Sequence, residues 1–109
     1  MERVFEHILA LIEIGQVKIS DHGYDELAAD DLYVHEIIES VKKGKIVEEY
    51  PNFHKGQCVL VLQEDKEGKP VHVVWGIPKG KTSPAVLITA YRPNPGSWEA
   101  GFLRRKKNE

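Results

Sequence analysis

Residues 45–92 constrain the fold most, because short breaks rich in Gly, Pro and charged residues divide them into four runs suited to β-strands. The runs are residues 45–50, 57–64, 69–77 and 85–92. The breaks are too short for helical crossovers, so neighbouring strands are expected to pair as antiparallel hairpins. This half of the chain therefore predicts a four-stranded, mostly antiparallel sheet.

The third run indicates which face of that sheet is covered. Val71, Val73 and Trp75 alternate with a second set of residues that contains His72. Alternation of period two sends the two sets to opposite faces. We expect the first set to face helices, which leaves His72 on the open face as a surface residue.

The first half of the chain predicts two or three helices. Residues 2–14 repeat apolar side chains at i, i+4 and i+7, and Gly15 ends this pattern. A short helix is expected to follow, capped by Ser20 or Asp21 and reaching about Ala29. A further helix is expected from Leu32 to Lys43, capped by Asp30 or Asp31. The predicted fold is α+β, with these helices on one face of a twisted four-stranded sheet and Lys18–Ser20 as a short extended connector.

Length and charge limit the number of domains and the kinds of partner. The chain has 109 residues, so we expect one domain over residues 1–109, with its core at about 4–98 and a basic tail at 103–109. Residues 1–50 carry five Lys/Arg and twelve Asp/Glu, a net charge of −7, whereas residues 51–109 carry ten and five, a net charge of +5. The sheet half is therefore the half suited to a polyanion, although a charged tail is more often simply solvated.

The N-terminal sequence resembles neither a signal peptide nor a membrane span, so the cytoplasm is the expected location. Cys58 is the one cysteine and lies within an apolar run. It reads as a small buried side chain more readily than as a reactive thiol.

The sequence contains no strong metal-binding or nucleotide-binding motif. CxxC, HExxH and Walker spacings are absent, and the five histidines are dispersed. We therefore expect no metal and no cofactor. A metal site built from His22, His54 and His72 remains the least favoured alternative.

Several other residues are candidates for contact with a phosphate or a base. His22 falls in the first turn of a predicted helix, where the helix dipole favours neutral imidazole and attracts anions. A histidine that only hydrogen-bonds its own turn is the alternative. Arg92 can grip a phosphate with two donors and Tyr91 can donate to it. Lys45 and Lys55 are candidate phosphate contacts, and Trp98 could stack on a base or pack at the edge of the core.

Three segments together resemble a known family. They are residues 19–22 (Ile-Ser-Asp-His) before a helix, residues 46–51 (Ile-Val-Glu-Glu-Tyr-Pro) after another, and residues 87–93 (Leu-Ile-Thr-Ala-Tyr-Arg-Pro). Their order resembles the domain-of-unknown-function family numbered 4258, grouped with the RelE-like toxins among the barnase-like and colicin-like nucleases. The likeness spans roughly residues 15–98.

The resemblance implies metal-free RNA cleavage on the sheet face opposite the helices, with the ribose 2′-hydroxyl as nucleophile. His22 would be the general base or acid, and Tyr91 and Arg92 would orient the phosphate. His72 joins them as a catalytic candidate through the strand alternation alone. The implied partners are RNA, free or on the ribosome, and a neutralising antitoxin. A non-catalytic module that binds RNA or a protein through the same face is the alternative function.

Overall fold

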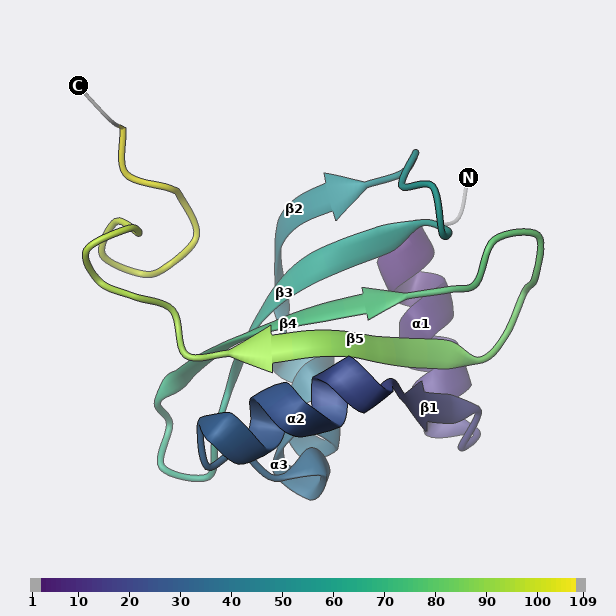
Figure 1. The fold of residues 1–109 in the computed structure, drawn as a ribbon, viewed down its shortest axis with the longest axis horizontal. Helices are drawn as coiled ribbons and strands as arrows, with labels where there is room; N and C mark the ends of the chain where they lie inside the picture. The colour runs from purple at the N-terminus through teal and green to yellow at the C-terminus, as the bar shows by residue number, and fades with distance from the viewer. Residues whose placement is uncertain (1–2, 108–109) are drawn as a thin grey trace.

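The computed structural model describes residues 3–107 as helices on one side of a mixed sheet (Figure 1). The helices and strands, in chain order, are α1 (Val4–Glu13), β1 (Val17–Ile19), α2 (Asp21–Ala29), α3 (Val34–Ser40), the 3-10 turn η1 (Val41–Lys43), β2 (Lys45–Tyr50), β3 (Cys58–Glu64), β4 (Pro70–Gly76) and β5 (Ala85–Tyr91). The α+β class and the positions of the last four strands are as predicted. The part of the first helix expected at residue 2 and the part of the tail at 108–109 lie outside the described residues.

The sheet has five strands rather than four, in the order β1-β5-β4-β3-β2. The additional strand is β1, which the sequence suggested only as an extended connector. It pairs parallel to β5, with Val17 opposite Ala85 and Ile19 opposite Leu87. Three residues are too few to show a strand period, and the pairing depends on a partner that comes much later in the chain. The remaining neighbours, β2–β3, β3–β4 and β4–β5, are antiparallel as expected.

The helix α2 runs alongside β5 and is hydrogen-bonded to it at both ends (Figure 1). At its start, the hydroxyl of Ser20 accepts from the Gly23 N–H and donates to the Ile88 carbonyl at 2.8 Å. Ser20 is therefore the cap that the sequence favoured. At its end, a carboxylate oxygen of Asp30 accepts from the Arg92 N–H at 3.1 Å. The segment after β1 is thus tied to β5 along the whole length of α2.

The third helix is shorter than predicted. It covers Val34–Ser40, is preceded by Tyr33 without a side-chain cap, and continues as the 3-10 turn η1. Asp31 has a φ of 54°, a left-handed conformation that turns the chain between α2 and α3. The predicted capping by Asp30 or Asp31 is therefore wrong, because one aspartate binds β5 and the other forms the turn.

The core lies between the helices and one face of the sheet. Val71, Val73 and Trp75 are fully buried there, as the alternation predicted. The core also contains a polar side chain, Gln63, which is 2% exposed. Its amide donates to the Ile37 carbonyl at 2.6 Å, and its oxygen accepts from the Trp75 indole at 2.8 Å. These bonds satisfy the buried amide and link α3 to β3 and β4 at a single point.

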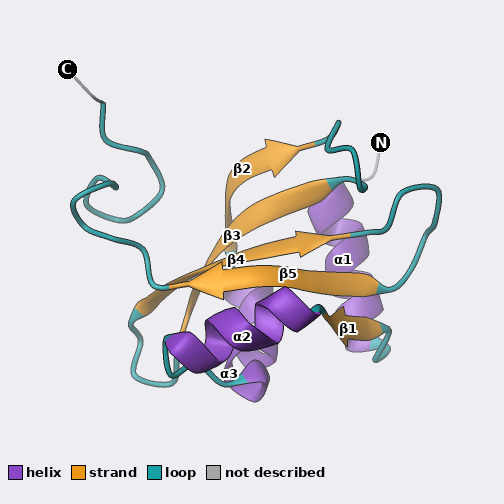
Figure 2. Ribbon diagram, in the orientation of Figure 1, coloured by secondary structure: helices purple, strands orange, loops and turns teal. Residues whose placement is uncertain are grey.

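The opposite face of the sheet, here called the open face, is covered at one end by the C-terminal segment, residues 93–107. This segment leaves β5 and makes an irregular loop beyond the end of the sheet (Figure 2), and its side chains Trp98 and Arg105 contact His72 and Glu48. A backbone bridge between Trp98 and Arg105 closes the loop. His72 lies on the open face as expected, but it is fully buried. Its prediction as a surface residue is wrong because the C-terminal segment covers it.

Candidate functional site on the open face

A polar cluster joins three strands to the C-terminal segment on the open face. Its members are Glu48 and Tyr50 of β2, His72 of β4, Tyr91 of β5, and Trp98 and Arg105 of the C-terminal segment. Glu48 and Tyr50 are two residues apart on one strand, so their side chains share a face. His72 of β4 is paired directly with Tyr91 of β5, so these two side chains also lie side by side.

The hydrogen bonds of His72 fix which ring nitrogen carries its proton. Nε2 lies 2.8 Å from the carbonyl oxygen of Phe102, which can only accept, so Nε2 is protonated. Burial lowers the pKa of His72, which favours the neutral ring. Nδ1 is then an acceptor and lies 3.2 Å from the Tyr91 hydroxyl. The Tyr91 proton therefore points at His72, and the phenol oxygen is held in one orientation.

Glu48 is surrounded by donors. Arg105 donates from Nε and Nη2 to its two carboxylate oxygens at 2.8 and 2.9 Å, and the Tyr50 hydroxyl donates to one of them. The bonds from Arg105 are the main reason that the pKa of Glu48 is lowered. Burial is the main reason that the pKa of Tyr50 is raised to about 12, and the hydrogen bond to Glu48 is the second. Glu48 is therefore an anion, and a phosphate could replace it as the partner of Arg105.

The rim of the cluster is accessible although its centre is closed. The side chain of Arg105 is 59% exposed and that of Glu48 is 31% exposed. Arg105 also lies over the Trp98 ring, 4.7 Å from its centre, and Trp98 packs edge-on against His72. Burial raises the pKa of Tyr91, and the charges of Arg105 and Glu48 both act on it. The cluster therefore combines a carboxylate that can act as a base (Glu48), a guanidinium that can bind a phosphate (Arg105) and an oriented phenol (Tyr91) at one surface.

Of the four predicted catalytic residues, the structure brings together His72 and Tyr91. His22 lies elsewhere, on the first turn of α2, with its side chain 65% exposed and 3.5 Å from Glu26. Arg92 is bonded at the other end of α2, to Asp30. At about 1.5 Å per residue these two ends are roughly 12 Å apart. His22 and Arg92 therefore do not share a site.

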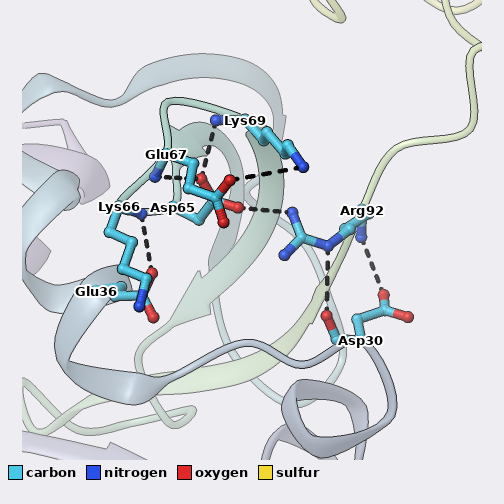
Figure 3. Close-up of polar contacts among 7 residues, drawn as sticks. All are labelled: Asp30, Glu36, Asp65, Lys66, Glu67, Lys69 and Arg92. Carbon is cyan, nitrogen blue, oxygen red and sulfur yellow. Dashed lines mark hydrogen bonds and ion pairs between the residues drawn. The ribbon is translucent and has the colours of Figure 1, made fainter.

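The guanidinium of Arg92 is bonded to two acidic residues, although the side chain is 37% exposed (Figure 3). Its guanidinium donates to Asp65 at 2.9 Å and to the Asp30 carbonyl at 3.3 Å. Burial alone would raise the pKa of Asp65, but hydrogen bonds from the Lys69 N–H, Arg92 and the Glu67 N–H lower it. Arg92 thus clamps the end of β5 to α2 and to the β3–β4 turn, which is a structural role.

The three residues predicted to contact RNA, Trp98, Lys45 and Lys55, lie in different parts of the structure. Trp98 is 4% exposed and packs on His72, which matches the alternative that it covers an edge of the structure. Lys45 is exposed but lines a pocket together with Glu36, Glu39 and Glu64. Lys55 is exposed in the β2–β3 loop at the other end of the sheet. Trp98 and Lys55 therefore offer no contact to a base or a phosphate at the open-face cluster, whereas the pocket at Lys45 reaches Phe102 of the C-terminal segment.

Sequence reasoning missed Glu48, Tyr50 and Arg105. A signal for the first two existed, because the period of the run 45–50 puts them on one face of a strand. Arg105 gave no such signal, since nothing in the basic tail showed which of its four cations returns to the sheet.

The described residues contain neither a metal-binding cluster nor a membrane-spanning helix. Residues 3–107 hold no group of three or more His, Cys, Asp or Glu side chains arranged to bind a metal ion. Within the same range, no helix has both the length and the apolar character needed to cross a membrane.

The family model described as "Domain of unknown function (DUF4258)" matches residues 19–92, from the last residue of β1 to the residue after β5. No curated protein and no solved structure matched the chain.

Proposed function

This chain belongs to the DUF4258 family of domains of unknown function, and we propose that it is a metal-independent endoribonuclease that acts through the open-face cluster. The observation that carries the proposal is the contact of Glu48 with Arg105 beside the oriented pair of Tyr91 and His72. The resemblance of three segments to RelE-like toxins supports the same class of reaction.

In the proposed reaction, an RNA phosphate takes the place of Glu48 as the partner of Arg105. Glu48, released from Arg105, accepts the proton of the ribose 2′-hydroxyl. The 2′-oxygen forms a bond to phosphorus, and the bond from phosphorus to the 5′-oxygen breaks. The Tyr91 hydroxyl turns away from Nδ1 of His72 and donates its proton to that leaving oxygen. The products are a 2′,3′-cyclic phosphate and a 5′-hydroxyl, and water carries the proton from Glu48 back to Tyr91.

Each residue has a distinct role in this scheme. Arg105 stabilises the charge that develops on the phosphate. Glu48 and Tyr91 are the base and the acid. His72 is a positioning residue, because it is buried behind Tyr91 and orients its hydroxyl. Tyr50 holds Glu48 in place.

The partners proposed with this activity are those of a toxin. RNA in the cytoplasm, free or on the ribosome, would be the substrate. A second protein that covers the open face would act as the antitoxin, since it would block Arg105 and Glu48 together.

A non-catalytic binding module is the second candidate. The full burial of His72 and the occupation of both Glu48 oxygens favour it, because a closed and satisfied network can be purely structural. The same open face would then bind RNA or a protein without chemistry.

Expression in a bacterial host without any candidate antitoxin tests these functions, with growth and RNA fragments as the readout. We expect growth arrest and RNA fragments that end in a cyclic phosphate. Glu48→Gln should reduce cleavage about 10²-fold or more, because it removes the general base. Glu49→Gln, on the next residue of the same strand, is the matched control and should cleave normally.

Two further outcomes separate the candidates. Cleavage that persists in Glu48→Gln and disappears in His22→Ala would return the active site to α2 and refute the open-face assignment. Growth arrest without new RNA ends, equal in wild type and Glu48→Gln, would identify the binding module.

A further inference from the structure

A pocket lies at the end of the molecule opposite the C-terminal segment. Its volume is about 620 Å³, and the N-terminal end of α1, the β2–β3 loop and the β4–β5 loop surround it. These three segments converge at one end of the sheet (Figure 1). A volume of this size is within the range of small-ligand sites.

Hydrogen bonds between the segments hold the walls of the pocket together. The Lys79 N–H donates to the Lys55 carbonyl at 2.9 Å, and the Ile77 N–H donates to the Gln57 carbonyl at 3.0 Å. His7 of α1 lies with Nε2 2.6 Å from the Thr82 carbonyl. A Cβ on Gly56 would stand 2.0 Å from the Ile77 carbonyl, so the two loops approach as closely as glycine allows. The pocket is therefore formed before any ligand arrives.

The side chains around this pocket carry one sign of charge. Arg3, Lys79 and Lys81 line it together with His7 and His54, and its described lining includes no Asp or Glu. Two carboxylates oppose this charge: Glu49, which lies 3.8 Å from Arg3 with both side chains well exposed, and Glu6 in the first turn of α1. α1 also begins here, and Arg3 provides no side-chain cap for its first turn. Free N–H groups at the start of a helix add to the attraction for an anion.

An aromatic pair adds a second kind of contact. Phe53 and His54 line the pocket with their ring centres 4.6 Å apart, and Phe53 is 43% exposed. An exposed ring beside cations is the combination that binds unpaired bases and their phosphates. A small acidic ligand would use the cations but would have no need of the ring.

The basic pocket and a hollow on the open face share one lining residue, Phe53. An apolar hollow of about 190 Å³ is lined by Tyr50, Phe53, Cys58, Val74 and Ile88. Phe53 also lines the basic pocket, and Tyr50 belongs to the open-face cluster. A single strand can therefore pass from the cluster, over an apolar floor, into the basic pocket.

We propose that this basic pocket binds the phosphates of single-stranded RNA, with a base stacked on Phe53. The inference deepens the proposed function by giving the substrate a second contact away from the reacting phosphate. Binding here needs no cleavage, so it is measurable by itself.

The test uses the whole protein and a short single-stranded 2′-O-methyl oligoribonucleotide, which lacks the attacking hydroxyl. Affinity is measured by fluorescence anisotropy over a range of salt concentrations. The double substitution Lys79→Ala/Lys81→Ala should weaken binding about tenfold and reduce the slope of log K against log salt by about 1.4, since each phosphate contact on a single strand contributes about 0.7. Lys18→Ala/Lys42→Ala removes two exposed charges outside the pocket and should leave both values unchanged.

Inorganic polyphosphate, which carries charge without bases, tests the role of Phe53. Phe53→Leu should weaken binding of the oligonucleotide and leave binding of polyphosphate unchanged. Equal loss for both probes would overturn the stacking contact. Wild-type protein that binds neither probe, or equal loss in the two lysine pairs, would overturn the pocket as a binding site.

The pocket and the nuclease can fail independently. Loss of binding in the Lys79→Ala/Lys81→Ala protein, with no RNA cleavage by wild type in cells, would leave an RNA-binding protein without the proposed chemistry. Cleavage that depends on Glu48 but no change in binding would leave the nuclease and refute the pocket.

Discussion

Arg105 reaches back across 57 residues of chain to bind Glu48 through two hydrogen bonds, and the ion pair fastens the C-terminal segment to β2. The guanidinium also stacks on Trp98, so one side chain holds both the anion and the ring that covers His72.

Loss of this side chain should release the C-terminal segment. Arg105→Ala removes an exposed two-pronged ion pair and a cation–π contact, together worth about 1 kcal/mol of unfolding free energy. We expect a red shift in tryptophan fluorescence as Trp98 becomes hydrated, and a lower midpoint of denaturation. Arg104→Ala, whose side chain is exposed, serves as the control. Unchanged fluorescence in Arg105→Ala would mean that other contacts hold the segment.

Stability should depend on pH through His72. Its pKa is lowered from an ordinary value of 6.5 by burial, so the unfolded chain takes up the proton first as the pH falls. The free energy of unfolding should therefore decrease below about pH 6.5, because the unfolded state binds more protons there. Glu48, whose pKa is lowered from 4.5, adds a second loss only in more acidic solution.

The groups that face His72 are Tyr91, Glu48 and Arg105, and the last two act on it with opposite sign. Urea denaturation on either side of pH 6.5 measures the effect. His72→Gln should remove the first decrease, whereas His35→Gln, at an exposed position, should keep it. A stability that is flat across this range in wild type would contradict the buried neutral ring.

The clamp of Arg92 predicts a structural rather than a binding phenotype. Arg92→Ala and Asp65→Asn should each destabilise the protein, and a double-mutant cycle should give a coupling on the order of 1 kcal/mol between them. RNA affinity should not change at a fixed salt concentration. A tenfold loss of RNA affinity in Arg92→Ala, with Asp65→Asn unaffected, would restore Arg92 as a phosphate ligand.

Gly23 should resist a substitution that normally strengthens a helix. Alanine is favoured over glycine within helices by about 1 kcal/mol. A Cβ at Gly23, however, would lie 2.9 Å from the Leu87 carbonyl oxygen, which is backbone and cannot turn aside. Gly23→Ala should therefore destabilise the protein by about 1–3 kcal/mol, the usual cost of overpacking. Thermal denaturation with a higher midpoint than wild type would show that α2 and β5 are less closely packed.

The sequence predicted the elements whose signals are local. The bounds of β2 and the alternation in β4 follow from the pattern of side chains alone, and Ser20 is a cap because its hydroxyl meets a nearby N–H. β1 could not be predicted, since its three residues become a strand only against β5. The burial of His72 was hidden for the same reason, because its cover comes from residues 98–105.

The residues of the candidate site also differ in whether the local sequence reveals their position. His72 and Tyr91 could be chosen because they lie on strands whose faces the sequence reveals. The bonds of Arg92 to Asp30 and Asp65 could not be predicted, because these partners lie at the end of α2 and in the β3–β4 turn. Arg105 required knowledge of how the tail returns to the sheet.

The position of β5 between β1 and β4 also determines when the protein can fold during synthesis. Ser20 donates to the Ile88 carbonyl, 68 residues further along the chain, so β1 and the hydroxyl proton of Ser20 have no partner until β5 leaves the ribosome. Contacts between residues so far apart close large loops and slow folding. The antiparallel strands β2, β3 and β4 can pair earlier as hairpins. We therefore expect a nascent chain that ends before residue 85 to expose the edge of β4, and β1 and α2 to dock only in the final step.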